Sequence, residues 1–92
     1  VGGATADAVG RRLSGLADEG AQVLVVTHSP QVAAFAARHF RVSKQQSDVQ
    51  TLSQVQSLDT EAQIGEIARM ISGDTITEEA RAAAQALISA KQ

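Results

Sequence analysis

The stretch that most constrains the fold is VLVVTHSPQVA, residues 23–33. Its first four residues, Val23–Val26, form an unbroken aliphatic run that is too short to be a helix. Such a run is typical of a strand buried on both faces, as in the middle of a parallel sheet. Pro30 suits the first position of a helix, because its fixed φ is already helical and it has no N–H to leave unpaired. Ser29 is then the natural N-cap.

The stretch therefore predicts a strand over 22–27, a tight polar turn and a helix from Gln31 to about Arg38. Ligands of open parallel sheets gather at the carboxyl ends of the strands. His28 occupies that position in the predicted unit. By spacing alone, a histidine after a buried strand is more often an ordinary turn residue than a catalytic one.

The remaining chain predicts further helices and strands. An apolar stripe predicts a helix over 4–19, closed by Gly20; its members are Ala6, Val9, Leu13, Leu16 and Ala17. Alternation over Phe40–Lys44 predicts a half-buried strand, followed by a polar turn over 45–48. Residues 49–58 have apolar residues at helical spacing but a strand-like composition, and we favour a strand.

Two helices are predicted in the last third. The first begins at Asp59 or Thr60, the latter paired with Gln63 in a capping box, and ends at Gly73. Its apolar stripe comprises Ile64, Ile67, Ala68 and Ile71. The second begins near Thr77 and faces the core with Ala80, Ala84, Leu87 and Ile88.

Composition excludes several classes of function. The formal net charge is −2 and the eight Lys and Arg residues are scattered, which argues against this segment binding nucleic acid electrostatically by itself. No cysteine is present, so there is no disulfide and no thiolate metal site, which fits the cytoplasm. No stretch approaches the ~18 apolar residues of a membrane span. The first residue is Val1, not Met, and we expect a longer parent protein.

The predicted architecture has a gap. A strand buried on both faces needs neighbours to pair its edges, yet no strand is predicted upstream of Val23–Val26. We therefore expect an α/β fold whose parallel sheet is completed by residues outside this chain, so that the chain is an incomplete domain.

The sequence resembles the C-terminal end of the ATPase head of RecN-type DNA repair proteins, which are SMC-like members of the ABC ATPase superfamily. Four stretches carry the resemblance: Val1-Gly2-Gly3, Thr27-His28-Ser29-Pro30-Gln31-Val32, Arg41-Val42-Ser43-Lys44 and Glu66-Ile67-Ala68-Arg69-Met70-Ile71-Ser72-Gly73. In that order, they look like the tail of the D-loop, the switch-histidine loop, the strand that follows this loop and the final paired helices of the family. Together they span nearly the whole chain.

The resemblance implies a fold and a domain organisation. Residues 1–92 would be the C-terminal lobe of a P-loop nucleotide hydrolase head, with the D-loop tail at 1–3, the switch-histidine loop at 23–33 and the C-terminal helices at 59–91. It also implies a role in ATP-driven repair of double-strand breaks and in recombination. Expected partners are the remainder of the head, a second head in an ATP-dependent homodimer, and DNA through the full-length protein. The expected location is the cytoplasm, in association with the nucleoid.

The resemblance further implies roles for individual residues. His28 would be the catalytic switch histidine, hydrogen-bonding the γ-phosphate of ATP and orienting the attacking water. Gly2, Gly3, Thr27 and Ser29 would join it in the nucleotide-binding set, the glycines allowing close backbone approach across the head dimer.

This sequence also departs from the family pattern. It has no G-x-x-x-x-G-K-[ST] loop, no ABC signature loop and no Walker B carboxylates. ATP and Mg²⁺ are therefore expected only in the complete head, no residue here is assigned as a metal ligand, and the chain alone should be inactive.

Two other hypotheses stay open. The chain could be a non-catalytic lobe that serves only dimerisation, or an independent small α/β domain unrelated to nucleotide. His39 is expected to be a strand-edge or surface histidine. The acidic pairs Asp18-Glu19 and Glu78-Glu79 are expected to be solvated or helix-terminal charges.

Overall fold

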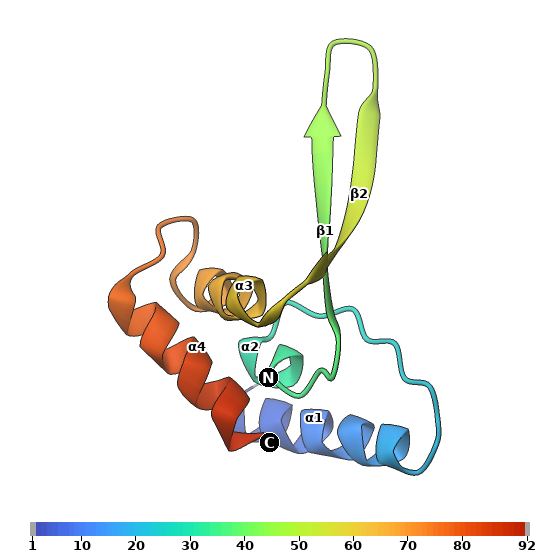
Figure 1. Ribbon diagram of the computed structural model, residues 1–92, viewed down its shortest axis with the longest axis vertical. Helices are drawn as coiled ribbons and strands as arrows, with labels where there is room; N and C mark the ends of the chain where they lie inside the picture. Colours follow the sequence, from blue (N-terminus) through green and yellow to red (C-terminus); the bar gives the residue numbers. More distant parts are fainter. Residues whose placement is uncertain (1, 92) are drawn as a thin grey trace.

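The computed structural model describes residues 2–91, so Val1 of the predicted D-loop tail lies outside the described residues. The elements in chain order are α1 (Gly3–Asp18), α2 (Pro30–Ala33), β1 (His39–Gln46), β2 (Thr51–Leu58), α3 (Thr60–Ser72) and α4 (Glu78–Ala90). The four helices form one body, and the β1–β2 hairpin projects from it (Figure 1). The α/β class is confirmed.

Helix α1 agrees with the predicted helix to within one residue at each end. Gly20, just beyond it, has a φ of +100°, as expected of a residue that closes a helix in the left-handed region. The predicted apolar stripe is only partly covered: Ala6 is buried, but Val9 and Leu16 remain exposed. Part of the apolar face of α1 therefore has no neighbour within the described residues.

The strand predicted over 22–27 is wrong for this structure. Residues 21–29 have no regular secondary structure, and the side chains of Leu24 and Val26 are 86% and 97% exposed. A strand requires a neighbour to pair its backbone N–H and C=O groups, and no described residue provides one for this segment. The only sheet in residues 2–91 is the antiparallel β1–β2 pair, so the predicted parallel sheet is not confirmed.

Helix α2 begins as predicted but is shorter. Ser29 is its N-cap and Pro30 its first residue, yet the helix ends at Ala33 instead of continuing to Arg38. The backbone N–H groups of Phe35 and Ala36 donate to carbonyls three residues back, which tightens the last turn and ends the helix.

The packing of α2 against α1 depends on Gly10. A Cβ atom placed on Gly10 would lie 2.3 Å from Cδ2 of Phe35, far inside van der Waals contact. The missing side chain therefore lets the Phe35 ring lie directly on the backbone of α1.

Strands β1 and β2 pair in antiparallel register from His39↔Leu58 to Gln46↔Thr51. Both predicted strands are thus confirmed, and the helical interpretation of residues 49–58 is wrong. The half-buried character predicted for the first strand is also wrong, because its apolar residues Phe40 and Val42 lie on the exposed side of the hairpin. The reversal lies at residues 47–50, slightly later than predicted, where the Ser47 N–H donates to the Gln50 carbonyl at 2.8 Å. Phe40, Val42 and Val55 remain exposed on the hairpin.

Helices α3 and α4 form the core together with α2. The buried residues that pack together are Ala33, Ala34, Ile64, Ile67, Ala68, Ala80, Ala84 and Ile88. Ile71, predicted in the same stripe, is 39% exposed. The side chains of Asp59 and Thr77 accept from the N–H groups of Ala62 and Ala80. Of the two predicted starts of α3, the one at Asp59 is therefore confirmed and the Thr60–Gln63 capping box is not, and α4 begins where it was predicted, just after Thr77.

Candidate functional site

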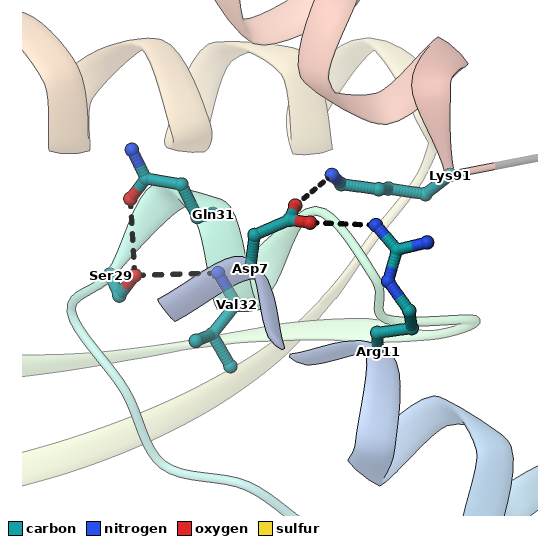
Figure 2. A network of polar contacts seen from close by, with 6 residues as sticks. All are labelled: Asp7, Arg11, Ser29, Gln31, Val32 and Lys91. Atoms are coloured by element: carbon teal, nitrogen blue, oxygen red, sulfur yellow. Dashed lines mark hydrogen bonds and ion pairs between the residues drawn. The ribbon is translucent and has the colours of Figure 1, made fainter. Parts of the chain in front are cut away.

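The predicted histidine loop leads into α2 and is held by local hydrogen bonds. The Ser29 backbone N–H donates to Oγ1 of Thr27 at 2.9 Å. Oγ of Ser29 accepts from the N–H of Val32 at 3.3 Å and lies 3.2 Å from Oε1 of Gln31, to which it donates (Figure 2). These contacts fix the backbone on both sides of His28.

His28 itself is exposed to solvent. Among the described residues it takes part in no side-chain hydrogen bond or ion pair. Its ring is therefore available to a group that approaches from outside the chain. The structure brings Thr27 and Ser29 into contact but leaves His28 without a protein partner in residues 2–91.

Gly2 and Gly3 lie where α1 begins. Gly2 is the N-cap residue, has extended backbone angles and has open space at its Cβ position. A Cβ placed on Gly3 would lie 3.6 Å from Nε2 of Gln31, an ordinary contact distance. The structure thus brings one glycine of the predicted D-loop tail next to the helix that follows the histidine loop.

His39 is the first residue of β1, in agreement with the predicted strand-edge position, but it is not a surface histidine. It is half-buried, and its Nδ1 atom is buried without a hydrogen-bond partner among the described residues. Burial lowers the pKa of His39, and the negative charge of nearby Glu66 opposes that shift. At neutral pH the folded chain therefore favours the neutral form of His39.

A buried ionic cluster lies between α3 and the base of the hairpin. Glu66 is the buried charged residue of the described chain, with a side chain only 6% exposed. Nε of Arg69 donates to both of its carboxylate oxygens at 3.1 Å, and Nε of Arg41 lies 3.5 Å from Oε2. The hydrogen bond from Arg69 is the main cause of a lowered Glu66 pKa; burial opposes it, and Arg41 adds to it.

A second ionic network joins α1 to the end of α4. The carboxylate of Asp7 accepts from Lys91 and from Nη2 of Arg11, the latter at 2.8 Å (Figure 2). The ammonium group of Lys91 also lies 4.5 Å from the centre of the Phe35 ring. The hydrogen bond from Lys91, followed by that from Arg11, lowers the pKa of Asp7.

Sequence reasoning missed both networks. The spacing of Asp7 and Arg11 is a helical i, i+4 signal that was available in the sequence. Lys91 lies 84 residues from Asp7 and had no such signal. Glu66 lies off the apolar stripe of its helix, so periodicity gave no signal that it would be buried.

The described residues contain no group of three or more His, Cys, Asp or Glu side chains that could hold a metal ion. Among the helices of residues 2–91, none combines the length and the apolar character needed to cross a membrane.

Comparison with known proteins shows which proteins the chain is similar to. No protein-family model matches it. It is 49% identical over 92 residues to a protein of Xylella fastidiosa named DNA repair protein RecN, a match that covers 100% of this chain and 16% of the relative. Proteins of the same name from Deinococcus radiodurans and Streptomyces coelicolor are 52% identical over 75 residues and 48% identical over 88 residues.

The matches to those two proteins cover 82% and 96% of this chain, and 13% and 15% of the respective relatives. The chain therefore spans about one sixth of the length of the relatives or less. These matches confirm, over the whole chain, the resemblance to RecN-type proteins that was predicted from the sequence motifs.

Proposed function

We propose that this chain, a RecN-type sequence throughout its length, is the lobe of an ATPase head that carries the switch histidine, His28. The observation that carries the proposal is the match of all 92 residues to a protein named DNA repair protein RecN, with an exposed His28 lying just before the N-cap Ser29 of α2. The process served would be DNA repair, including recombination.

The chemistry assigned to His28 follows from its exposure. An imidazole N–H that faces solvent can donate a hydrogen bond to an oxygen of an approaching γ-phosphate, or orient the water that attacks the phosphorus in line. Ser29 and Thr27 contribute by fixing the backbone on either side, so that the ring meets the phosphate from a defined direction. Loss of the γ-phosphate would then remove the contact and release the lobe.

The rest of the reaction belongs to residues outside this chain. The sequence has no phosphate-binding loop with its lysine and no Walker B carboxylates, so ATP and Mg²⁺ would be held by the remainder of the head. We accordingly expect no ATP turnover from this chain alone.

The exposed aliphatic run supports incorporation into a larger head. Val23–Val26 has the composition of a buried strand, yet two of its side chains are almost fully exposed. Neighbouring strands of the remainder of the head would pair its backbone and cover its side chains. His28 would then lie at the carboxyl end of a paired strand.

The glycines at the start of α1 fit a contact with a second head. Gly2 is exposed and has free space at its Cβ position, so another backbone can approach it closely. The proposed assembly is a dimer of heads that encloses ATP, in a protein that engages DNA through its other parts.

Substitution of His28 tests the proposal. In a complete RecN-type protein that contains this chain, His28→Ala should lower kcat for ATP by roughly 10²–10³-fold, the usual cost of removing a group that stabilises transition-state charge. Nucleotide affinity should change little. His39→Gln is the matched control, since it alters the other histidine, on β1, and should keep normal turnover. Normal turnover in the His28→Ala protein would contradict the assignment.

The exposed apolar surface also favours a second candidate, a lobe that serves only in dimerisation. Leu24 and Val26 would then be covered by another subunit. In that case His28→Ala leaves hydrolysis intact, whereas Val26→Ser weakens self-association measured by analytical ultracentrifugation.

A further inference from the structure

The cluster around Glu66 has a geometry that its helix alone does not explain. At 100° per residue, position 66 lies on the side of α3 away from the stripe formed by Ile64, Ile67 and Ala68. A residue there should be exposed, yet Glu66 is only 6% exposed. Something other than the helical core must therefore cover it.

One face of the hairpin contributes to this cover, together with Arg69 of α3 itself. Residues 39 and 41 point to the same side of β1, because side chains alternate along a strand. Arg41 reaches Glu66 at 3.5 Å, and the charge of Glu66 acts on His39. The face that includes Lys44 is the opposite one, and Lys44 forms no ion pair within the described residues.

Chain connectivity fixes where the hairpin starts but not its tilt. β1 leaves the turn after α2, and β2 runs through Leu58 and Asp59 directly into α3. Most of the hairpin extends away from the helices (Figure 1). The contact between Arg41 and Glu66 joins the strand that is not continuous with α3 to the side of that helix.

The energetics favour one position of the hairpin. A carboxylate removed from water is costly unless cations and hydrogen bonds compensate for it. Arg69 lies on the same helix and compensates for Glu66 whatever the hairpin does. Arg41 compensates only when β1 lies over α3, so the buried carboxylate selects that arrangement.

We propose that the Arg41–Glu66 contact is a lock that fixes the tilt of the hairpin against α3. The opposite side of α3 packs on Ala33, the last residue of α2, and on Ala34 directly after it. The lock therefore joins the hairpin and the helix after the histidine loop into one rigid unit. When the Arg41–Glu66 contact is present, the hairpin, α3 and α2 move together. When the contact is broken, the hairpin can move independently of the two helices.

The experiment measures hairpin position in this chain by paired spin labels. The sequence has no cysteine, so Val49→Cys at the tip and Ala83→Cys on α4 label specifically. Both positions are exposed. Pulsed electron spin resonance should give one narrow distance distribution for the otherwise unchanged chain. A broad distribution there contradicts the lock directly.

Arg41→Ala is the decisive variant and Lys44→Ala its control. Both remove one cation from β1, but only the first removes a partner of Glu66. We expect a broadened distribution with Arg41→Ala and an unchanged one with Lys44→Ala. An equally narrow distribution in both variants overturns the proposal.

Glu66→Gln provides a second test that keeps side-chain size. It should broaden the distribution as Arg41→Ala does, and combining the two substitutions should broaden it no further. Additive broadening would mean that the two residues act separately, which also overturns the lock. Circular dichroism of each variant checks that the helices persist. A loss of helix with Arg41→Ala would show that Arg41 is needed for folding, and would overturn its role in fixing the tilt of the hairpin.

Discussion

Gly10→Ala tests how closely α1 and the turn after α2 approach one another. The added Cβ would lie 2.3 Å from Cδ2, 2.6 Å from Cε2 and 3.2 Å from Cγ of Phe35. Carbon atoms in van der Waals contact are separated by about 3.5–4.0 Å, so either the ring or the helix must shift by more than about 1 Å. Overpacking of this kind typically costs about 1–3 kcal/mol.

The gain in helix propensity reduces that cost. Replacing glycine by alanine within a helix is worth about 0.8–1.0 kcal/mol. We therefore expect Gly10→Ala to lower the free energy of unfolding by about 0–2 kcal/mol. Gly15→Ala is the matched control, because Gly15 lies on the same helix and has nothing within 4 Å of its Cβ position. It should raise the free energy of unfolding by about 0.5–1 kcal/mol.

Thermal unfolding followed by circular dichroism measures the difference. At roughly 4–8 °C per kcal/mol for a domain of this size, the melting temperatures of the two variants should differ by at least about 4 °C. In a Phe35→Ala background, Gly10→Ala should become stabilising, since the opposing ring is gone. If Gly10→Ala and Gly15→Ala raise the melting temperature equally in the original chain, the close approach of Phe35 is refuted.

Two further predictions concern pH. The pKa of Asp7 lies below its ordinary value of 3.8, so its stabilising contribution is complete above that pH and is lost as the pH falls through the lower folded value. Asp7→Asn should therefore lower the melting temperature at neutral pH, and its effect should shrink as the pH falls progressively below 3.8; an effect that stays the same across that range would contradict the ion pairs. The pKa of His39 lies below 6.5, so the unfolded chain binds the proton more readily and stability should fall as the pH drops below 6.5. His39→Gln should remove that decline between about pH 7 and pH 5, and a NMR titration midpoint for His39 above 6.5 would contradict the shift.

Local signals in the sequence predicted most of the elements. Asp59 and Thr77 cap their helices through their own side chains, and Gly20 and Gly73 adopt positive φ angles where helices end. Each of these depends on residues within a few positions of one another, so a single sequence contains the necessary information.

Features that depend on distant partners were not predictable in the same way. Val23–Val26 has the composition of a central strand, but pairing requires a neighbour that the described residues lack. Glu66 is buried where Arg69 of α3 and Arg41 of β1 meet its carboxylate, and the periodicity of its own helix does not reveal this contact with a distant strand. The sequence motif singled out His28, whereas the contact between Gly3 and Gln31 required the packing of α1 on α2.

The exposed aliphatic segment between α1 and α2 has a further consequence for the isolated chain. Residues 21–27, AQVLVVT, are uncharged, free of proline and glycine, and rich in β-branched side chains. Segments of that composition readily stack into cross-β fibrils when they are not shielded. In concentrated solution, fibril growth should therefore begin at this segment, and a lysine at position 24 or 26 would act as a gatekeeper that suppresses it.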